Sequence, residues 1–208
     1  MASTVIQYTS HADDSIPAVA VASGYTRAKL TEDALQKFVV PFVDFRVWDA
    51  IATNLPGTSA SDDLGLYGGT FGTDAPLIRT YDVKNAGAVT LRTRVQVCLP
   101  AEYVASGDIT LRFHAGMITT VASSTATIDV EAYAADKDGT LGSDLCTTSA
   151  TTINSLTFAA KDFVITGTGL NPGDWLDVRV TIAVNDSATA TAVIAAIGSA
   201  ELLCDIKG

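Results

Sequence analysis

Apolar and polar residues alternate most regularly near the end of the chain, from Trp175 to Val184. The alternating apolar positions are Leu176, Val178, Val180, Ile182 and Val184. Because successive side chains of a strand point to opposite faces, this period of two predicts a strand with one buried and one wet face. Residues 190–200 are apolar on both faces, which is typical of a strand deep in a sheet. The two segments together predict a long β-hairpin that forms one side of an all-β core.

Short strands separated by turn residues fill the rest of the second half of the chain. The expected strands cover residues 77–83, 89–99, 108–117, 125–135, 153–158 and 162–166. Asp-Lys-Asp-Gly at 136–139 predicts a tight turn, and Asn-Pro-Gly-Asp at 171–174 predicts a type II turn. With about eight strands and no helical pattern between them, the chain is predicted to form an antiparallel β-sandwich, most simply a jelly roll.

The first third of the chain is less regular. Residues 1–24 have no stable period and are interpreted as an extended arm or a frayed terminus, which leaves 25–208 as the sandwich domain. Thr31 followed by acidic residues predicts a short helix over 31–37. Residues 39–48 read as the first long strand, with an edge position or a break at Pro41 because proline cannot donate a ladder hydrogen bond. The glycine-rich stretch 54–73 reads as a loop.

Composition and charge exclude several classes of function. The chain has 208 residues, a net charge of −10 and only 17% charged residues. Thirteen scattered basic residues argue against a nucleic-acid partner, and the low charge suggests a surface partly covered by other subunits. No apolar run is long enough to span a membrane. Cys98, Cys146 and Cys204 are widely spaced and are expected to be free thiols, as in a protein made and folded in a reducing cytoplasm.

No pattern of catalytic or metal-binding residues stands out. His114 has no motif around it, the Asp-x-Asp-Gly at 136–139 fails as a calcium loop, and no zinc ligand set exists. Asp129 and Glu131 share a strand face, but nothing favours them as a glycosidase pair. The chain is therefore predicted to be no enzyme and to need no cofactor. Its candidate contact residues, for a glycan or for another subunit, are aromatic: Trp48, Trp175 and Tyr67.

Five segments of the chain resemble a family of small β-rich proteins encoded in tailed-bacteriophage genomes. They are Asp-Leu-Gly-Leu-Tyr-Gly-Gly-Thr-Phe-Gly at 63–72, His-Ala-Gly-Met at 114–117, Ser-Asp-Leu-Cys at 143–146, Ser-Leu-Thr-Phe at 155–158 and the ending at 201–208. The resemblance implies a structural role in the virion and assigns no functional residues.

Within a virion, capsid decoration, a tail or fibre module and a coat subunit are the roles that suit a small acidic β-protein. The acidic balance and low charge favour a capsid decoration (cement) protein, a homo-trimer on the outside of the major capsid protein lattice. The alternative is a glycan-binding module of a tail fibre or tail-associated receptor-binding protein. A glycoside hydrolase comes third. The expected location is the capsid exterior.

Overall fold

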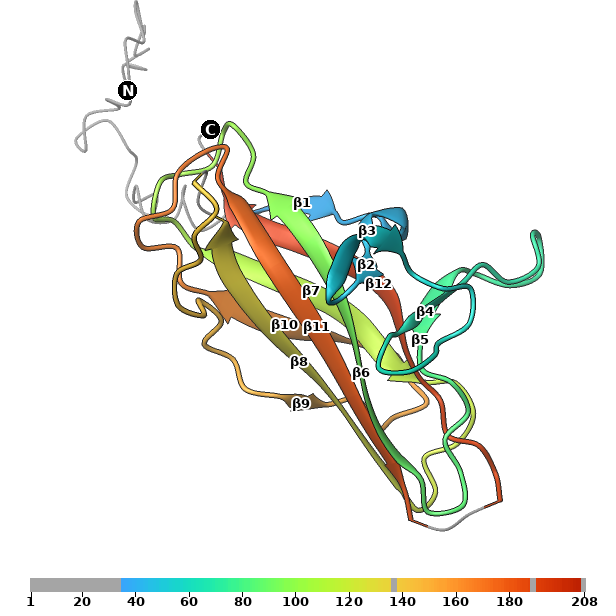
Figure 1. Ribbon diagram of the computed structural model, residues 1–208. Helices are drawn as coiled ribbons and strands as arrows, with labels where there is room; N and C mark the ends of the chain where they lie inside the picture. The colour runs from blue at the N-terminus through green and yellow to red at the C-terminus, as the bar shows by residue number, and fades with distance from the viewer. Residues whose placement is uncertain (1–34, 136–137, 188–189, 207–208) are drawn as a thin grey trace, which may run out of the picture.

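The computed structural model describes residues 35–135, 138–187 and 190–206 and shows two antiparallel sheets packed face to face (Figure 1). Sheet A has the order β10-β7-β12-β5-β4, with β1 also paired to β12, and sheet B has the order β3-β2-β6-β11-β8-β9. The strands of sheet A are β1 (Leu35–Val39), β4 (Gly65–Tyr67), β5 (Leu77–Arg79), β7 (Ile109–Met117), β10 (Ala159–Ile165) and β12 (Ala195–Asp205). Those of sheet B are β2 (Arg46–Val47), β3 (Ala50–Asn54), β6 (Ala88–Cys98), β8 (Ser124–Ala135), β9 (Thr151–Thr152) and β11 (Trp175–Asp186).

Eight of these strands pair in a nested order. β5 pairs with β12, β6 with β11, β7 with β10, and β8 with β9, so the chain from β5 to β12 is one long hairpin rolled into two sheets. Each strand in this run lies in a different sheet from the strand before it, except β9, which lies beside β8 in sheet B. This is the strand order of a jelly roll, and it confirms the predicted all-β sandwich.

The predicted hairpin of the last two strands is wrong. β11 lies in sheet B between β6 and β8, whereas β12 lies in sheet A between β7 on one side and β5 and β1 on the other. The period of two correctly identified β11 as a strand with one wet face, but periodicity carries no information about which strand is the partner. In a jelly roll the last two strands belong to opposite sheets and cover the core from both sides.

Three local predictions also need correction. Leu35–Val39 forms β1 against β12, so the described part of the predicted helix is a strand; residues 31–34 and the predicted arm lie outside the described residues. Hydrogen bonding to a free sheet edge outweighs a weak helix-start signal. The predicted strand 39–48 is interrupted at Pro41, as expected for proline, and a 3-10 turn over Phe42–Asp44 precedes β2.

Residues 153–158 do not form the predicted strand. This segment instead connects β9 of sheet B to β10 of sheet A, and the ring of Phe158 lies so close to Gly116 and Gly198 that a Cβ on these glycines would meet it at 2.9 and 3.3 Å, respectively. The two glycines therefore make room for the ring on two neighbouring strands of sheet A.

The inward residues of the long strands form one core between the sheets, as their alternation predicted. They include the even-numbered residues of β11 and the odd-numbered residues of β7, among which Phe113 meets Phe163 edge to face at 6.1 Å between ring centroids. Thr93 is buried among them and donates a hydrogen bond to the carbonyl of Arg46. Cys98, Cys146 and Cys204 are free, as predicted. Among the described residues no helix is long and apolar enough to cross a membrane.

Candidate functional site

The side chains that β6, β11 and β8 turn away from the core form one surface, called here the sheet B outer face. Its members are Thr90, Arg92, Arg94 and Gln96 of β6, Trp175, Asp177, Arg179, Thr181, Ala183 and Asn185 of β11, and Thr125, Thr127, Asp129, Glu131 and Tyr133 of β8. The strand register sets these residues in rows across the three strands. Arg179, for example, lies between Arg94 and Glu131.

Ion pairs fix the middle of this face. Arg94 donates two hydrogen bonds to the carboxylate of Asp177, one of them from Nε to Oδ1 at 2.6 Å. Asp177 is only 7% exposed, and its hydrogen bonds raise the pKa of Arg94. Arg179 contacts Glu131 on the next strand through Nε and Nη2, which both reach the same carboxylate oxygen, Oε2. Since a bidentate pair fixes two side chains in one plane, the polar groups in this row are held in place before any ligand arrives.

Trp48 reaches the same face from the turn between β2 and β3. Its indole Nε1 donates a hydrogen bond of 2.8 Å to Oδ2 of Asp62, which also pairs with Arg92 at 3.6 Å. The guanidinium carbons of Arg92 and Arg179 lie 5.3 and 5.7 Å from the centre of the Trp48 ring. Trp48 is half-buried, and its ring makes cation–π contacts with both guanidinium groups.

Trp175 is the most open aromatic residue of the face, with 45% of its surface exposed. It stands at the start of β11, opposite Cys98 on β6 and Ala135 on β8. Tyr133 is opposite Asp177, two residues further along β11, and so is the diagonal neighbour of Trp175. Diagonal neighbours on one sheet face are about 7–8 Å apart, within reach of aromatic side chains. The two rings therefore share one end of the face.

Tyr133 is tied to the acidic residues beside it. Its hydroxyl donates to Oε1 of Glu131 at 3.4 Å. The pKa of Tyr133 is raised, first by desolvation and then by the charges of Glu131 and Asp144. The phenol therefore stays protonated and remains a hydrogen-bond donor at neutral pH.

Tyr67, the third aromatic residue predicted as a contact, lies elsewhere. It is on β4 in sheet A, where the guanidinium of Arg79 covers its ring at 3.6 Å and its hydroxyl accepts a hydrogen bond from the Ser59 backbone N–H. The structure thus brings Trp48 and Trp175 to one face and keeps Tyr67 apart. The sequence does not reveal the partners of Arg94 and Arg179, because cross-strand partners depend on register.

The residues weighed for catalysis do not converge. His114 is on β7 in sheet A, whereas Asp129 and Glu131 are on β8 in sheet B. Glu131 is occupied by Arg179, and the pKa of Asp129 is raised, mainly by desolvation. Among the described residues, no group of three or more His, Cys, Asp or Glu side chains is placed to hold a metal ion.

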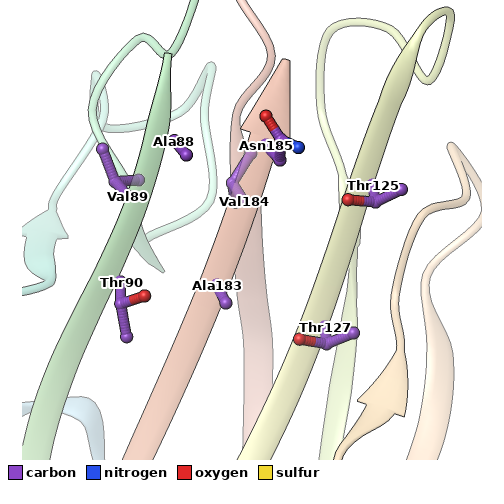
Figure 2. A pocket seen from close by; sticks show the side chains of 8 residues that line it. All are labelled: Ala88, Val89, Thr90, Thr125, Thr127, Ala183, Val184 and Asn185. Carbon is purple, nitrogen blue, oxygen red and sulfur yellow. The ribbon is translucent and has the colours of Figure 1, made fainter. Parts of the chain in front are cut away.

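A shallow trough of about 250 Å³ lies at the opposite end of the sheet B outer face from Trp175. Figure 2 shows its lining residues on the three neighbouring strands: Ala88, Val89, Thr90, Thr125, Thr127, Ala183, Val184 and Asn185. The small Ala183 in the middle strand lets the surface dip between the threonines on either side. The polar groups of the trough are hydroxyls and one amide, with no charged side chain among its lining residues.

No protein-family model matches the sequence, and no curated protein sequence matches it. Among solved structures, a xylan-binding module CBM15 is similar over 84% of this chain and 99% of its own, with 14% identity and a TM-score of 0.40. The CBM22-1 xylan-binding domain of Paenibacillus barcinonensis matches over 70% and 83%, with 10% identity and a TM-score of 0.38.

The enzymatically active domain of bacteriophage CBA120 tailspike protein 4 matches over 80% of this chain and 18% of its own, with 12% identity and a TM-score of 0.33.

Proposed function

We propose that this protein is a glycan-binding module and that it binds a polysaccharide on the sheet B outer face. The observation that carries the proposal is the position of the open ring of Trp175 diagonally across from Tyr133, at one end of a polar sheet face whose charged side chains are already fixed. Under this proposal the protein is a tail-fibre or tail-associated module of a bacteriophage that recognises the host surface. Binding requires no catalytic group.

The chemistry of a sugar fits such a surface. A pyranose ring has an apolar face of C–H groups, which packs on an aromatic ring, and a rim of hydroxyls, which exchange hydrogen bonds with amides, carboxylates and guanidinium groups. Gln96 and Tyr133 stand on either side of Asp177 in the row beside Trp175 and supply such polar partners. Because β11 is hydrogen-bonded on both sides, little conformational entropy is lost when the ligand binds.

The contribution of Trp175 follows from its exposed area. A tryptophan side chain presents up to about 250 Å², so 45% exposure leaves roughly 100 Å² for a ligand to cover. At about 25 cal/mol per Å² this corresponds to at most about 2.5 kcal/mol. Removing the ring is therefore expected to weaken binding by about 10- to 60-fold.

The test is gel electrophoresis through soluble polysaccharides, neutral and acidic, including those of candidate host bacteria. We expect at least one polysaccharide to retard the wild-type protein, Trp175→Ala to lose the retardation and Trp175→Phe to keep most of it. Phe71→Ala is the matched control, because Phe71 is a fully exposed aromatic residue outside this face. No retardation by any polysaccharide, or equal losses for Trp175→Ala and Phe71→Ala, would refute the proposal.

A second candidate, capsid decoration, is favoured by a different observation. The loop between β4 and β5 extends away from the sandwich (Figure 1) and presents Phe71 fully exposed. The loop is held by hydrogen bonds from the backbone N–H groups of Thr73 and Asp74 to the Thr70 carbonyl and from the Thr70 N–H to Asp74. An exposed phenylalanine on a fixed turn is typical of an anchor for a protein partner.

In this second reading Phe71 binds the major capsid protein lattice, and the protein acts as a homo-trimer. The exposed apolar side chains of Leu35, Val39 and Val43 add to the same kind of surface. Cosedimentation with assembled shells checks it: Phe71→Ala should lose binding while Trp175→Ala keeps it. Wild-type protein that does not sediment with shells would exclude this role.

A further inference from the structure

The charged groups of the sheet B outer face include no unpaired arginine among the described residues. Arg92, Arg94 and Arg179 each pair with a carboxylate, those of Asp62, Asp177 and Glu131. Asp129 adds a further carboxyl group to the face, and β6, β8 and β11 carry no lysine. Among the described residues of this face, no cationic side chain is left to receive the carboxylate or sulfate of an acidic sugar. A ligand with many negative charges would also be repelled by the net charge of −10 of the whole chain.

The trough at the far end of the face is lined by polar but uncharged side chains, unlike an ion-binding site. Thr90, Thr125, Thr127 and Asn185 line it, and none of their side chains takes part in a hydrogen bond within the described residues. Each threonine hydroxyl is both a donor and an acceptor, and so is the asparagine amide. Sugar hydroxyls are donors and acceptors as well, which makes these side chains suitable partners for an uncharged glycan.

We propose, on the basis of the glycan-binding function above, that the ligand is an uncharged polysaccharide that runs along β11 from Trp175 to the trough. The ten-residue step from Trp175 to Asn185 corresponds to about 33 Å of extended strand, room for several sugar units. Trp175 and Tyr133 hold the chain at one end by stacking, and the threonines bind it at the other end by hydrogen bonds. The middle is lined by the neutralised ion pairs.

The experiment compares neutral polysaccharides (mixed-linkage β-glucan, arabinoxylan and dextran) with acidic ones (alginate, polygalacturonate and polysialic acid). Affinity electrophoresis of the wild-type protein is run at low salt and at roughly 0.5 M salt, where the Debye length is only a few ångströms. We expect retardation by at least one neutral polymer, by none of the acidic polymers, and with no more than a twofold change between the two salt concentrations.

A pair of isosteric variants tests the trough. Thr127→Val removes one hydroxyl from it, and we expect affinity for the neutral polymer to fall about fivefold, the equivalent of one net hydrogen bond. Thr110→Val is the matched control, because Thr110 is a half-buried strand threonine on the outer side of sheet A. Equal affinity of the two variants would refute the path along β11.

The outcomes separate this inference from the function on which it rests. Binding to acidic polymers alone, or binding that salt abolishes, would overturn the uncharged ligand and leave the glycan-binding function standing. Absence of binding to every polymer, including the host polysaccharides tested above, would overturn both.

Discussion

Replacing Arg94 with methionine should destabilise the protein more than the same change at Arg112. Both arginines form a bidentate pair with an aspartate on a neighbouring strand, Arg94 with Asp177 in sheet B and Arg112 with Asp162 in sheet A. The pairs differ in burial. The side chains of Arg94 and Asp177 are 30% and 9% exposed, whereas those of Arg112 and Asp162 are 32% and 45% exposed.

The magnitude follows from the carboxylate that is left behind. Removing one partner of a buried ion pair costs about 3–5 kcal/mol, because the other charge stays buried without compensation. Arg94 is partly open to water, which can reach the carboxylate once the guanidinium is gone, so we expect about 2–3 kcal/mol for Arg94→Met. For Arg112→Met the carboxylate of Asp162 is already well hydrated, and the expected cost is at most about 1 kcal/mol.

Urea denaturation followed by tryptophan fluorescence measures both values. For a domain of this size, about 2–3 kcal/mol also lowers the melting temperature by roughly 5–10 °C, which calorimetry detects. The double variant Arg94→Met/Asp177→Leu should recover most of the loss, because no unpaired charge remains. Equal losses for Arg94→Met and Arg112→Met, or a double variant less stable than Arg94→Met, would show that the burial of Asp177 does not control the energetics of the face.

Two further predictions concern the buried thiol of Cys204 and the close contact between Gly167 and Gly107. Burial raises the pKa of Cys204 from 9.0 to about 11, with the charge of Asp205 adding to the effect. Since the unfolded chain loses this proton at lower pH than the folded one, the free energy of unfolding should fall by up to about 1.4 kcal/mol per pH unit between pH 9 and 11. Urea titrations across that window should give a shallower slope for Cys204→Ala; an unchanged slope would contradict the assignment. At Gly167 a Cβ would lie 2.0 Å from the carbonyl oxygen of Gly107, so Gly167→Ala should cost about 2 kcal/mol or more, whereas Gly142→Ala, with nothing within 4 Å, should change stability by less than about 0.5 kcal/mol. Thermal melts give the melting temperatures of the two variants, and equal values would count against the close contact between Gly167 and Gly107.

Sequence periodicity was sufficient for most strands and for the side of each strand that faces the core. It identified β6, β7, β8 and β11 to within a residue or two at each end, because these strands are long and half-buried. It failed where a residue's neighbours are set by distant parts of the chain. β1 forms because β12 offers it an edge, and 153–158 is held by Phe158 on two glycines from different strands. The local sequence reveals neither β12 as the partner of β1 nor the two glycines as the partners of Phe158.

The same distinction applies to the candidate site. That Trp175 and Arg179 point to the same side of β11 follows from the sequence alone. That Tyr133 is the diagonal neighbour of Trp175, and that Asp177 receives Arg94, depends on the register with β8 and β6. Trp48 joins the face from a separate turn through Asp62, Arg92 and Arg179. A register shift of one residue would reverse the faces of a strand and remove all three relations.

The alternation along β11 makes stability and the proposed binding separable. Its even-numbered residues, such as Val178 and Val180, are completely buried in the core, whereas Trp175 and Arg179 extend from the other side of the same backbone. Truncating an even-numbered residue leaves a cavity between the two sheets and lowers stability whatever the protein binds. Truncating Trp175 removes a ring that is already half in water and costs the fold little. If the sheet B outer face is the binding surface, affinity must therefore change with exposed odd-numbered residues such as Trp175, whereas stability changes with the even-numbered residues and with Asp177, the one buried odd-numbered residue of β11.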